Sequence, residues 1–536
     1  MIKIKHPNQL DIFDPWAFLT PKRRQMLDAD WPGLFREYIL PSIPVSKVTK
    51  YFDANRGRPS KELYSMLGAL ILQQAFDLTD EETIQQYAFN IQWHYSLNIT
   101  EESDSAKYIS LKTLWSGRNI VATNNLEDDI FNAGTDNLAK VFNVNTDNQR
   151  IDSVHIKSNM RRLGRIGIFS ESIHKFLVNL RRSHQNWFDT VDKKLIDKYL
   201  LTESLSCFSR VKPSESRKTL AEVSKDLFDL VQQFKGEPDI AAMYSYKLLE
   251  RVLKEHCNLT GDKANPIELR KPKDIPSNSL QNPSDTDASY SGHKGQGYQA
   301  QVMETYLKDK DPENKGLNLI TYVETEPAHN SDANALMEAI ESTEHRDLKP
   351  DALVADSLYG SDSNYEQAKQ HEVELIAPTI GSVTEDKLSL SEFEISDKCQ
   401  ITACPQGQKP KKIKKRKLIS VGFASQDCEN CPNLSICPVQ KGKNLYYLRF
   451  SEKQIRIAKR RAYEESVAFK EKYRWRAGVE ATMSELDRRT GIKHLRVRGL
   501  KAVKYCVKLK ALAINIFRAA AVRIEKLLSV DAYAVA

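Results

Sequence analysis

The stretch Arg150-Ile151-Asp152-Ser153-Val154-His155-Ile156 decides the fold, because the sequence changes there from helical spacing to strand-like alternation. Polar and apolar residues alternate along it, and three of the seven side chains are β-branched. We therefore predict a strand over 150–156. Asp152 would then lie on a rigid element that can hold a carboxylate in place.

The chain before this strand follows a helical pattern. After Arg56-Gly57-Arg58-Pro59, Ser60 is placed to cap a helix. Apolar residues from Leu63 to Ile71 then recur at helical spacing, and Thr79 opens a further helix. We predict an all-helical N-terminal domain over 1–149.

The order of elements after Asp152 predicts an α/β fold. Further strands are expected at 298–306, 317–323, 352–356 and 374–377, with helices at 332–341, 364–371 and 452–536. A mixed sheet with helices packed on it satisfies this order. We place the first part of this core at 150–380 and its last part at 452–536. Two insertions interrupt it: a helical one over roughly 159–285, of unknown purpose, and a polar one over 381–451.

The net charge of +8 is mild, but the positive charges are unevenly distributed. Seven of the nine residues from Lys409 to Lys417 are Lys or Arg, and a second basic stretch runs from Lys453 to Lys510. Clustered cations gain affinity for a polyanion by releasing its counterions, so a polyanionic partner is one interpretation. A solvated charged face is the other, and charge alone does not decide between them.

Nothing in the sequence indicates a membrane protein. No apolar run approaches the roughly 20 residues that cross a bilayer. The start, MIKIKHPNQLDIFD, lacks the apolar core of a secretion signal. We therefore expect a cytoplasmic protein with no membrane partner.

Three acids fit the chemistry of metal-assisted phosphoryl transfer: Asp152 in RIDSVHIKSN, Asp356 in ALVADSLYG and Glu480 in YRWRAGVEATM. Mg²⁺ prefers oxygen ligands, and two such ions about 3.5–4 Å apart can hold the attacking and the leaving oxygen in line. Each acid also has an ordinary interpretation. The aspartates could be cap or turn residues, and Glu480 could form an ion pair with Arg476.

The last acid lies in a recognisable segment. Tyr473, Arg476 and Glu480 have the spacing Y-x2-R-x3-E, followed by Gly491-Ile492-Lys493, then Arg496-Val497-Arg498-Gly499-Leu500, then a terminal helix with Asn515. This segment resembles one large branch of bacterial DDE transposases. GRPSKELYSMLGALILQQ at 57–74 is similar to the helical N-terminal segment of these proteins. The resemblance covers most of the chain from 57 to 520.

This resemblance implies a ribonuclease H-like fold in which Asp152, Asp356 and Glu480 bind two Mg²⁺ or Mn²⁺ ions. It also implies double-stranded DNA as the partner, both the terminal inverted repeats and the target. Two protomers would pair the two ends in a synaptic complex. A DNA-binding role for the N-terminal domain and a nucleoid-associated location in bacteria follow from the same resemblance.

Six residues around Glu480 are candidates for contacting DNA: Tyr473, Arg476, Arg488, Lys493, Arg496 and Arg498. An arginine at 476 suits a bidentate contact to phosphate. The family usually has a lysine seven residues after the glutamate, whereas this chain has Asp487. Arg488, Arg489 or Lys493 could supply the missing cation. Trp475 could stack on a base, although a core position is the favoured interpretation.

A second metal site is expected in the polar insertion, where five of the eight cysteines fall within 39 residues. Cys404 begins a Cys-Pro-x-Gly turn, and Cys428-x2-Cys431 is followed closely by Cys437. Four such thiolates are typical of a structural Zn²⁺ site, with Cys399 as a substitute for Cys404. Free reduced thiols are the alternative. A zinc knuckle would present Lys409 to Lys417 to DNA, whereas the alternative for that run is a disordered loop.

The sequence thus predicts a transposase that cleaves phosphodiesters at the ends of an insertion sequence and transfers the ends into target DNA. One alternative is a ribonuclease H-like nuclease that cuts without joining. The other is a domesticated protein that binds DNA without catalysis. A strand-transfer assay distinguishes the transposase from the nuclease. Loss of cleavage on Asp152→Asn, with DNA binding intact, would exclude the non-catalytic protein.

Overall fold

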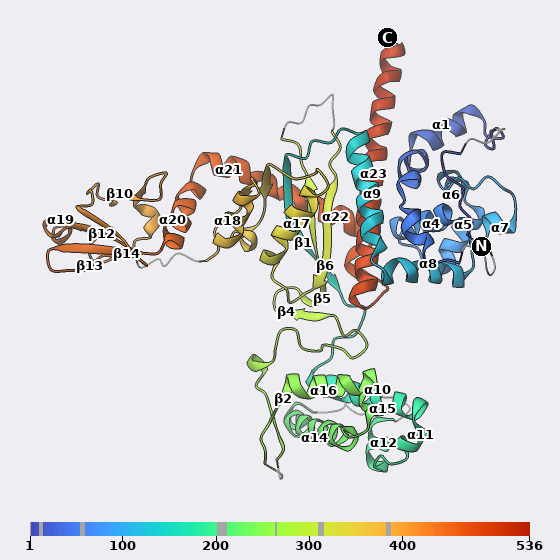
Figure 1. Ribbon diagram of the computed structural model, residues 1–536, viewed down its shortest axis with the longest axis horizontal. Helices are drawn as coiled ribbons and strands as arrows, with labels where there is room; N and C mark the ends of the chain where they lie inside the picture. Colours follow the sequence, from blue (N-terminus) through green and yellow to red (C-terminus); the bar gives the residue numbers. More distant parts are fainter. Residues whose placement is uncertain are drawn as a thin grey trace.

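The computed structural model describes residues 2–9, 14–53, 59–200, 212–262, 265–308, 316–381 and 387–535. Figure 1 shows a central sheet, an N-terminal group of helices beside it, a helical lobe below it and an arm that projects to one side. The expected α/β fold is therefore found, with a mixed sheet and many helices.

The central sheet is built around the predicted strand. Its strands are β1 (Asn148–Lys157), β4 (Ser289–Ser291), β5 (Gly295–Thr305), β6 (Ile320–Pro327), β7 (Ala352–Val354) and β8 (Glu374–Ile376). They lie in the order β4-β5-β1-β7-β8, and β6 also pairs with β5. β5 runs antiparallel to β1, β4 and β6, whereas β7 runs parallel to both β1 and β8. β7 pairs only with the start of β1, up to Arg150.

Two different layers cover the sheet, because successive side chains of a strand point to opposite faces. On one face, Ile151 and Met303 join a core formed with α17 (Ala335–Glu344) and α18 (Asp362–Gln370). On the other face, Val154 and Val302 join a larger core that includes α23 (Leu500–Val535). Asp152 points toward this second face.

Most of the N-terminal helices share that larger core with the sheet, whereas Leu27 of the first helix lies in a small cluster of its own with Trp16, Leu19 and Tyr95. The N-terminal helices are α1 (Pro21–Ala29), α2 (Trp31–Leu34), α3 (Val45–Thr49), α4 (Leu63–Ala75), α5 (Asp80–Phe89), α6 (Ile91–Ser96), α7 (Asp104–Lys107), α8 (Leu111–Thr123) and α9 (Leu126–Val141). α23 packs against α4, α9 and β6, and so joins these helices to the sheet (Figure 1). The predicted cap of α4 was wrong: Glu62 caps it by accepting from Tyr64 and Ser65 N–H, while Ser60 Oγ accepts from Lys3 N–H.

The lobe has a hydrophobic core of its own. It consists of α10 (Arg165–Ser183), α11 (Gln185–Phe188), α12 (Lys193–Tyr199), α14 (Ser216–Phe234), α15 (Pro238–Ala241), α16 (Tyr244–His256) and a hairpin of β2 (Cys257–Leu259) and β3 (Ile267–Leu269). These helices lie within residues 159–285, the range for which the sequence predicts a helical insertion. It leaves the sheet after β1 and returns before β4 (Figure 1).

The arm is a small β-structure with its own apolar cluster. It contains β9 (Glu394–Ile395), β10 (Ile401–Ala403), β11 (Lys412–Lys415), β12 (Ile419–Ala424), α19 (Ser425–Glu429), β13 (Gln440–Lys441) and β14 (Leu445–Phe450). The lysine run is ordered rather than a disordered loop, because β11 pairs with β12 at the edge of a four-stranded sheet. All four β11 side chains are exposed.

The chain returns from the arm to the sheet through three helices, α20 (Glu452–Glu464), α21 (Val467–Tyr473) and α22 (Gly478–Thr490). None of the helices in the described ranges combines the length and the apolar character that crossing a bilayer requires.

Candidate active site at the sheet edge

The fold brings two of the predicted acids to one edge of the sheet. Asp152 lies two residues beyond Arg150, and Asp356 lies two residues beyond Val354, the residue that pairs with Arg150. Because β1 and β7 are parallel, both acids follow the last paired positions on the same side of the sheet. Asp356 Oδ1 accepts the Leu358 N–H at 2.8 Å and so caps a short helical turn, Ser357–Tyr359.

Burial and several neighbouring charged groups act on the pKa of Asp152. Burial raises the pKa of its carboxyl, and the charges of Asp356 and Asp332 add to the rise. The Ser153 N–H, 2.8 Å from Asp152 Oδ1, and the Arg476 guanidinium act in the opposite direction. Arg476 Nη2 lies 3.3 Å from Asp152 Oδ2. A cation between the aspartates would relieve their repulsion.

Glu480 is not assembled with the two aspartates. It lies in the first turn of α22, four residues beyond Arg476, and its side chain is exposed. Arg476 contacts Asp152 rather than forming the ordinary ion pair with Glu480. Within the described ranges, no three His, Cys, Asp or Glu side chains are grouped so that they could hold a metal ion.

A buried charge network fixes α22 against the sheet. Glu304 of β5 is fully buried, and its carboxylate pairs with Arg150 at 2.7 Å and with Arg518 of α23 at 2.9 Å. Thr482 Oγ1 of α22 donates to the same carboxylate at 2.6 Å. Arg150 Nη1 donates to the Trp475 carbonyl oxygen at 3.0 Å, just before α22 begins.

Gly478, the first residue of α22, belongs to this arrangement. A Cβ at this position would collide with the Arg150 guanidinium. The helix that carries Glu480 therefore lies directly against the buried arginine, and a larger side chain at this position would displace either the guanidinium or the helix.

A second polar network supports the opposite face of β1. Lys294 Nζ lies 2.6 Å from Ser153 Oγ and 3.2 Å from Asp332 Oδ2. Gln301 Nε2 donates to Asp332 Oδ1 at 2.8 Å, and Tyr359 Oη donates to Gln301. Asp332 is buried, with a side-chain exposure of 5%. This network ties β1 and β5 to the turn that follows Asp356.

Glu304, Lys294 and Asp332 were not predicted from the sequence. Only Glu304 carries a signal, because an acid interrupts an otherwise strand-like, buried stretch from Tyr298 to Tyr306. Lys294 and Asp332 lie in polar connections where charged residues are common, so nothing distinguishes them before the strands are paired.

The remaining predicted DNA contacts lie apart from Asp152, and most have internal partners. Lys493 pairs with Asp487 at 3.5 Å, and Arg496 pairs with Asp77 at 2.9 Å. Arg498 Nη1 lies 3.3 Å from Met160 Sδ. Arg488 is exposed near the end of α22.

The aromatic residues before α22 pack inside the protein. Trp475 stacks on Tyr306 with ring centroids 5.7 Å apart, which favours the core interpretation over base stacking. Tyr473 stacks on Phe469 at 5.4 Å and is half-buried. Burial raises the pKa of Tyr473.

Four cysteines of the arm line one small apolar pocket: Cys404, Cys428, Cys431 and Cys437. Gly407, at φ +78°, donates its N–H to the Cys404 carbonyl oxygen at 2.8 Å and closes the Cys-Pro-Gln-Gly turn. Cys431 N–H donates to the Cys428 carbonyl oxygen at 3.1 Å. Burial and the three neighbouring thiols raise the pKa of Cys428 to about 11. Cys399 does not line this pocket.

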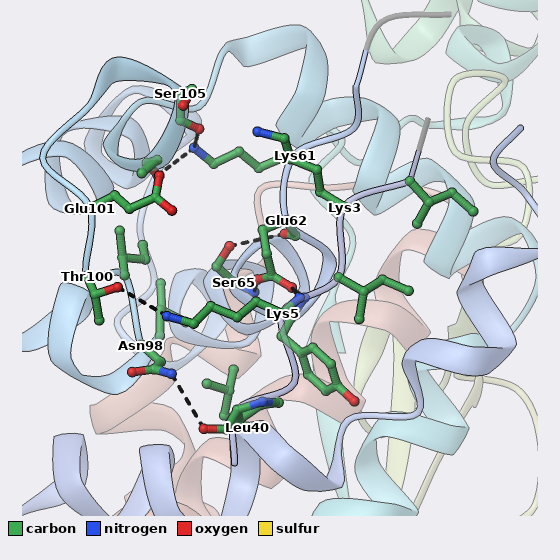
Figure 2. Close-up of a pocket in the computed structure, with 17 residues that line it drawn as sticks. Lys3, Lys5, Leu40, Lys61, Glu62, Ser65, Asn98, Thr100, Glu101 and Ser105 are labelled. Atoms are coloured by element: carbon green, nitrogen blue, oxygen red, sulfur yellow. Dashed lines mark hydrogen bonds between the residues drawn. The ribbon is translucent and has the colours of Figure 1, made fainter. Parts of the chain in front are cut away.

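A larger pocket, of about 380 Å³, lies among the N-terminal helices rather than at the acids (Figure 2). Lys3, Lys5 and Lys61 contribute to its lining. Lys61 Nζ donates to the carbonyl oxygens of Ala106 and Tyr108, at 2.5 and 2.9 Å, at the end of α7. Burial lowers the pKa of Lys61 to about 8.

Two protein families match separate parts of the chain. Residues 403–520 match a family described as "Transposase DDE domain", and this range includes Glu480 and the pocket cysteines. Residues 30–119 match a family described as "Transposase domain (DUF772)", a range that runs from α2 into α8. No curated protein sequence matches the chain. Both matched families are transposase families, and together the two matches indicate a DDE transposase of the insertion-sequence type.

Proposed function

We propose that this transposase cleaves DNA at the ends of its own insertion sequence and joins them to target DNA. Asp152, Asp356 and Glu480 are the proposed ligands of two Mg²⁺ or Mn²⁺ ions. The observation that carries the proposal is the placement of Asp152 and Asp356 at one sheet edge, with Arg476 of the segment before α22 bonded to Asp152.

The strand arrangement supports a ribonuclease H-like core. β6, β5 and β1 form an antiparallel set, and β7 and β8 continue the sheet in parallel with β1. Asp152 lies on the central strand, and Asp356 follows the neighbouring one. Glu480, exposed in the first turn of the adjacent helix, is the proposed third ligand.

The oxygen donors fit divalent cations of this kind, since Mg²⁺ and Mn²⁺ prefer carboxylates. When bound, such ions supply Lewis acidity and an activated water. The chain's own residues orient the DNA. Arg476 is placed to exchange its contact with Asp152 for a bidentate contact with a phosphate. Hydrolysis of a phosphodiester then leaves a 3′-hydroxyl that attacks the target strand.

A structural zinc site in the arm belongs to the same proposal. Four sulfur donors from two tight turns and one following segment are the usual set for Zn²⁺. Since the thiols are neighbours rather than an assembled ligand set, zinc binding requires them to draw in around the pocket. The site would fix the end of the sheet that carries β11.

A strand-transfer assay tests the proposal. The probe is a labelled duplex that ends in the element's terminal repeat with a free 3′-hydroxyl, mixed with plasmid DNA and Mg²⁺. Joined products with wild type, and none with Asp356→Asn, are expected. Cleavage without joined products would favour the hydrolytic nuclease. DNA binding without either reaction would favour the non-catalytic protein. Sedimentation of the complex with two labelled ends tests the proposed synaptic homodimer.

A further inference from the structure

Cations from two distant segments meet where β1 ends. Lys157 is the last residue of β1, Arg161 and Arg162 lie in the connection that follows, and Arg498 immediately precedes the Gly499-Leu500 start of α23. We call these four residues the β1-exit surface. Lys157, Arg161 and Arg162 are exposed, and none of the four forms an ion pair with a residue that the structure describes.

The backbone of this surface is held in place. Ser158 donates its N–H to the Gln296 carbonyl oxygen at 3.3 Å and its hydroxyl to Asp285 at 2.5 Å. Asn159 Nδ2 donates to the Arg496 carbonyl oxygen at 3.0 Å. Asn282 Nδ2 donates to the Arg161 carbonyl oxygen at 3.1 Å. The arginine side chains therefore extend from a fixed frame, which lowers the entropy cost of binding a ligand.

The acids beside this surface do not neutralise it. Asp285 is buried and accepts from Ser158, Tyr298 and the Gly499 N–H. Asp287 accepts the Leu500 N–H at 2.9 Å. Both carboxylates are thus engaged in holding the chain together, and the positive charge of the surface remains available to an external anion.

The surface continues directly from the candidate active site. Asp152 and Lys157 are on the same strand, and the edge of β1 beyond Arg150 has no pairing with β7. Five residues of strand span about 17 Å, at about 3.4 Å per residue. This distance corresponds to about five base pairs of duplex DNA at 3.4 Å per step.

We infer that the β1-exit surface binds the phosphate backbone of duplex DNA on the side of the cleavage site that leads to the helical lobe. The inference rests on the proposed function and adds to it a path for the DNA and the residues that hold it. Contacts of this kind position the duplex without reading its sequence.

The salt dependence of DNA binding tests the inference. The full chain and its R161A/R162A variant are titrated into a fluorescein-labelled 30-base-pair duplex of arbitrary sequence, between 50 and 200 mM KCl without divalent ions. Each lost phosphate contact lowers the slope of log K against log salt by about 0.9, so a decrease of about 1.8 is expected. The affinity ratio of wild type to variant should then shrink about twelve-fold across this range.

The matched control is R181A/R182A, which removes the same charge from the far end of α10, about 26 Å along the helix from Arg165. Its slope should stay close to that of wild type. An R161E/R162E variant should weaken binding further, and thermal unfolding should be unchanged in all three variants because these side chains are exposed.

Tight wild-type binding with an unchanged slope in R161A/R162A would overturn the inference and leave the proposed function standing. An equal decrease in the R181A/R182A control would also overturn it, because the effect would then be one of total charge. Absence of any duplex binding by wild type would overturn the proposed function as well.

Discussion

The acids of the sheet edge and the cysteines of the arm are both proposed metal ligands, but the chain assembles them in opposite ways. Asp152 and Asp356 are about two hundred residues apart in sequence and meet only because β1 and β7 pair. The four pocket cysteines lie between 404 and 437 and are arranged by local turns. One site depends on the whole sheet, whereas the other depends on a short segment.

The two proposed metal sites also differ in the polarity of their surroundings. Charged networks flank the acids on both faces of β1, through Glu304 on one side and Asp332 on the other. An apolar pocket surrounds the thiols. Changes to the acids should therefore affect chemistry and leave stability intact, whereas changes to the thiols should affect stability and leave the chemistry intact.

The largest expected effect is the loss of cleavage in Asp152→Asn. Loss of a ligand to the catalytic ions should lower single-turnover cleavage by at least about a thousand-fold while duplex binding persists. Because burial and neighbouring acids disfavour the Asp152 charge, the melting temperature at pH 7 should stay level or rise. A fall in melting temperature with cleavage retained would show that Asp152 contributes to stability rather than to chemistry.

Glu304→Gln should reduce stability strongly, because it leaves Arg150 and Arg518 buried without their shared carboxylate. Removing one partner from a buried ion pair costs about 3–5 kcal/mol, measurable by chemical denaturation. Glu485→Gln is the matched control, since Glu485 pairs with the same Arg518 at the partly exposed rim. A loss in Glu485→Gln as large as that in Glu304→Gln would show that the buried position has no special role.

Glu127→Gln should change the pH dependence of stability. Glu127 is fully buried without a hydrogen-bond partner among the described residues, and burial raises its pKa to about 7 despite Lys504 and Lys508. The native state thus holds a proton that the unfolded chain releases above about pH 4.5, so wild-type stability should fall between about pH 4.5 and 7. Glu127→Gln should remove this fall in stability. At pH 8 its free energy of unfolding should exceed that of wild type by on the order of 2–3 kcal/mol.

The neighbouring Asp128 provides the control for this prediction. Its carboxylate pairs with Lys504 at 3.1 Å and Lys508 at 2.7 Å, which hold its pKa low against the effect of burial. Asp128→Asn should therefore lose stability at both pH 5 and pH 8. Equal urea midpoints for Glu127→Gln and wild type at pH 8 would contradict the account of Glu127.

Cys428→Ser should have the smallest effect on overall stability, because the loss of structure should be confined to the arm. Purified wild type should contain about one zinc per chain by elemental analysis, and the variant should contain almost none. Limited proteolysis should then cut the arm near β11 faster, while cleavage of prebound DNA stays within about two-fold of wild type. Ser substitution at Cys399, outside the pocket, should leave the zinc content unchanged.

The elements of the candidate active site differ in how far the sequence could predict them. β1 and Asp152 were predictable from alternation, and Asp356 from a buried strand that ends in an acid. The cap of α4 was not, because Ser60 is engaged by the distant Lys3. The network around Glu304 was not predictable from the sequence either, because it joins β1, β5, α22 and α23 across more than three hundred residues. Residue spacing predicts individual strands and the acids at their ends, whereas contacts between distant segments are visible only once the strands are paired.

The decisive experiment compares wild type and Glu480→Gln in the Mg²⁺-dependent cleavage of a labelled duplex that carries the element's own ends. Glu480 is exposed, and the described residues contain no group of three His, Cys, Asp or Glu side chains that could hold a metal ion. Nicking at the element boundary is expected for wild type and not for Glu480→Gln, with equal DNA binding by both proteins. Equal cleavage by both proteins would contradict this expectation and would remove Glu480 from the proposed site.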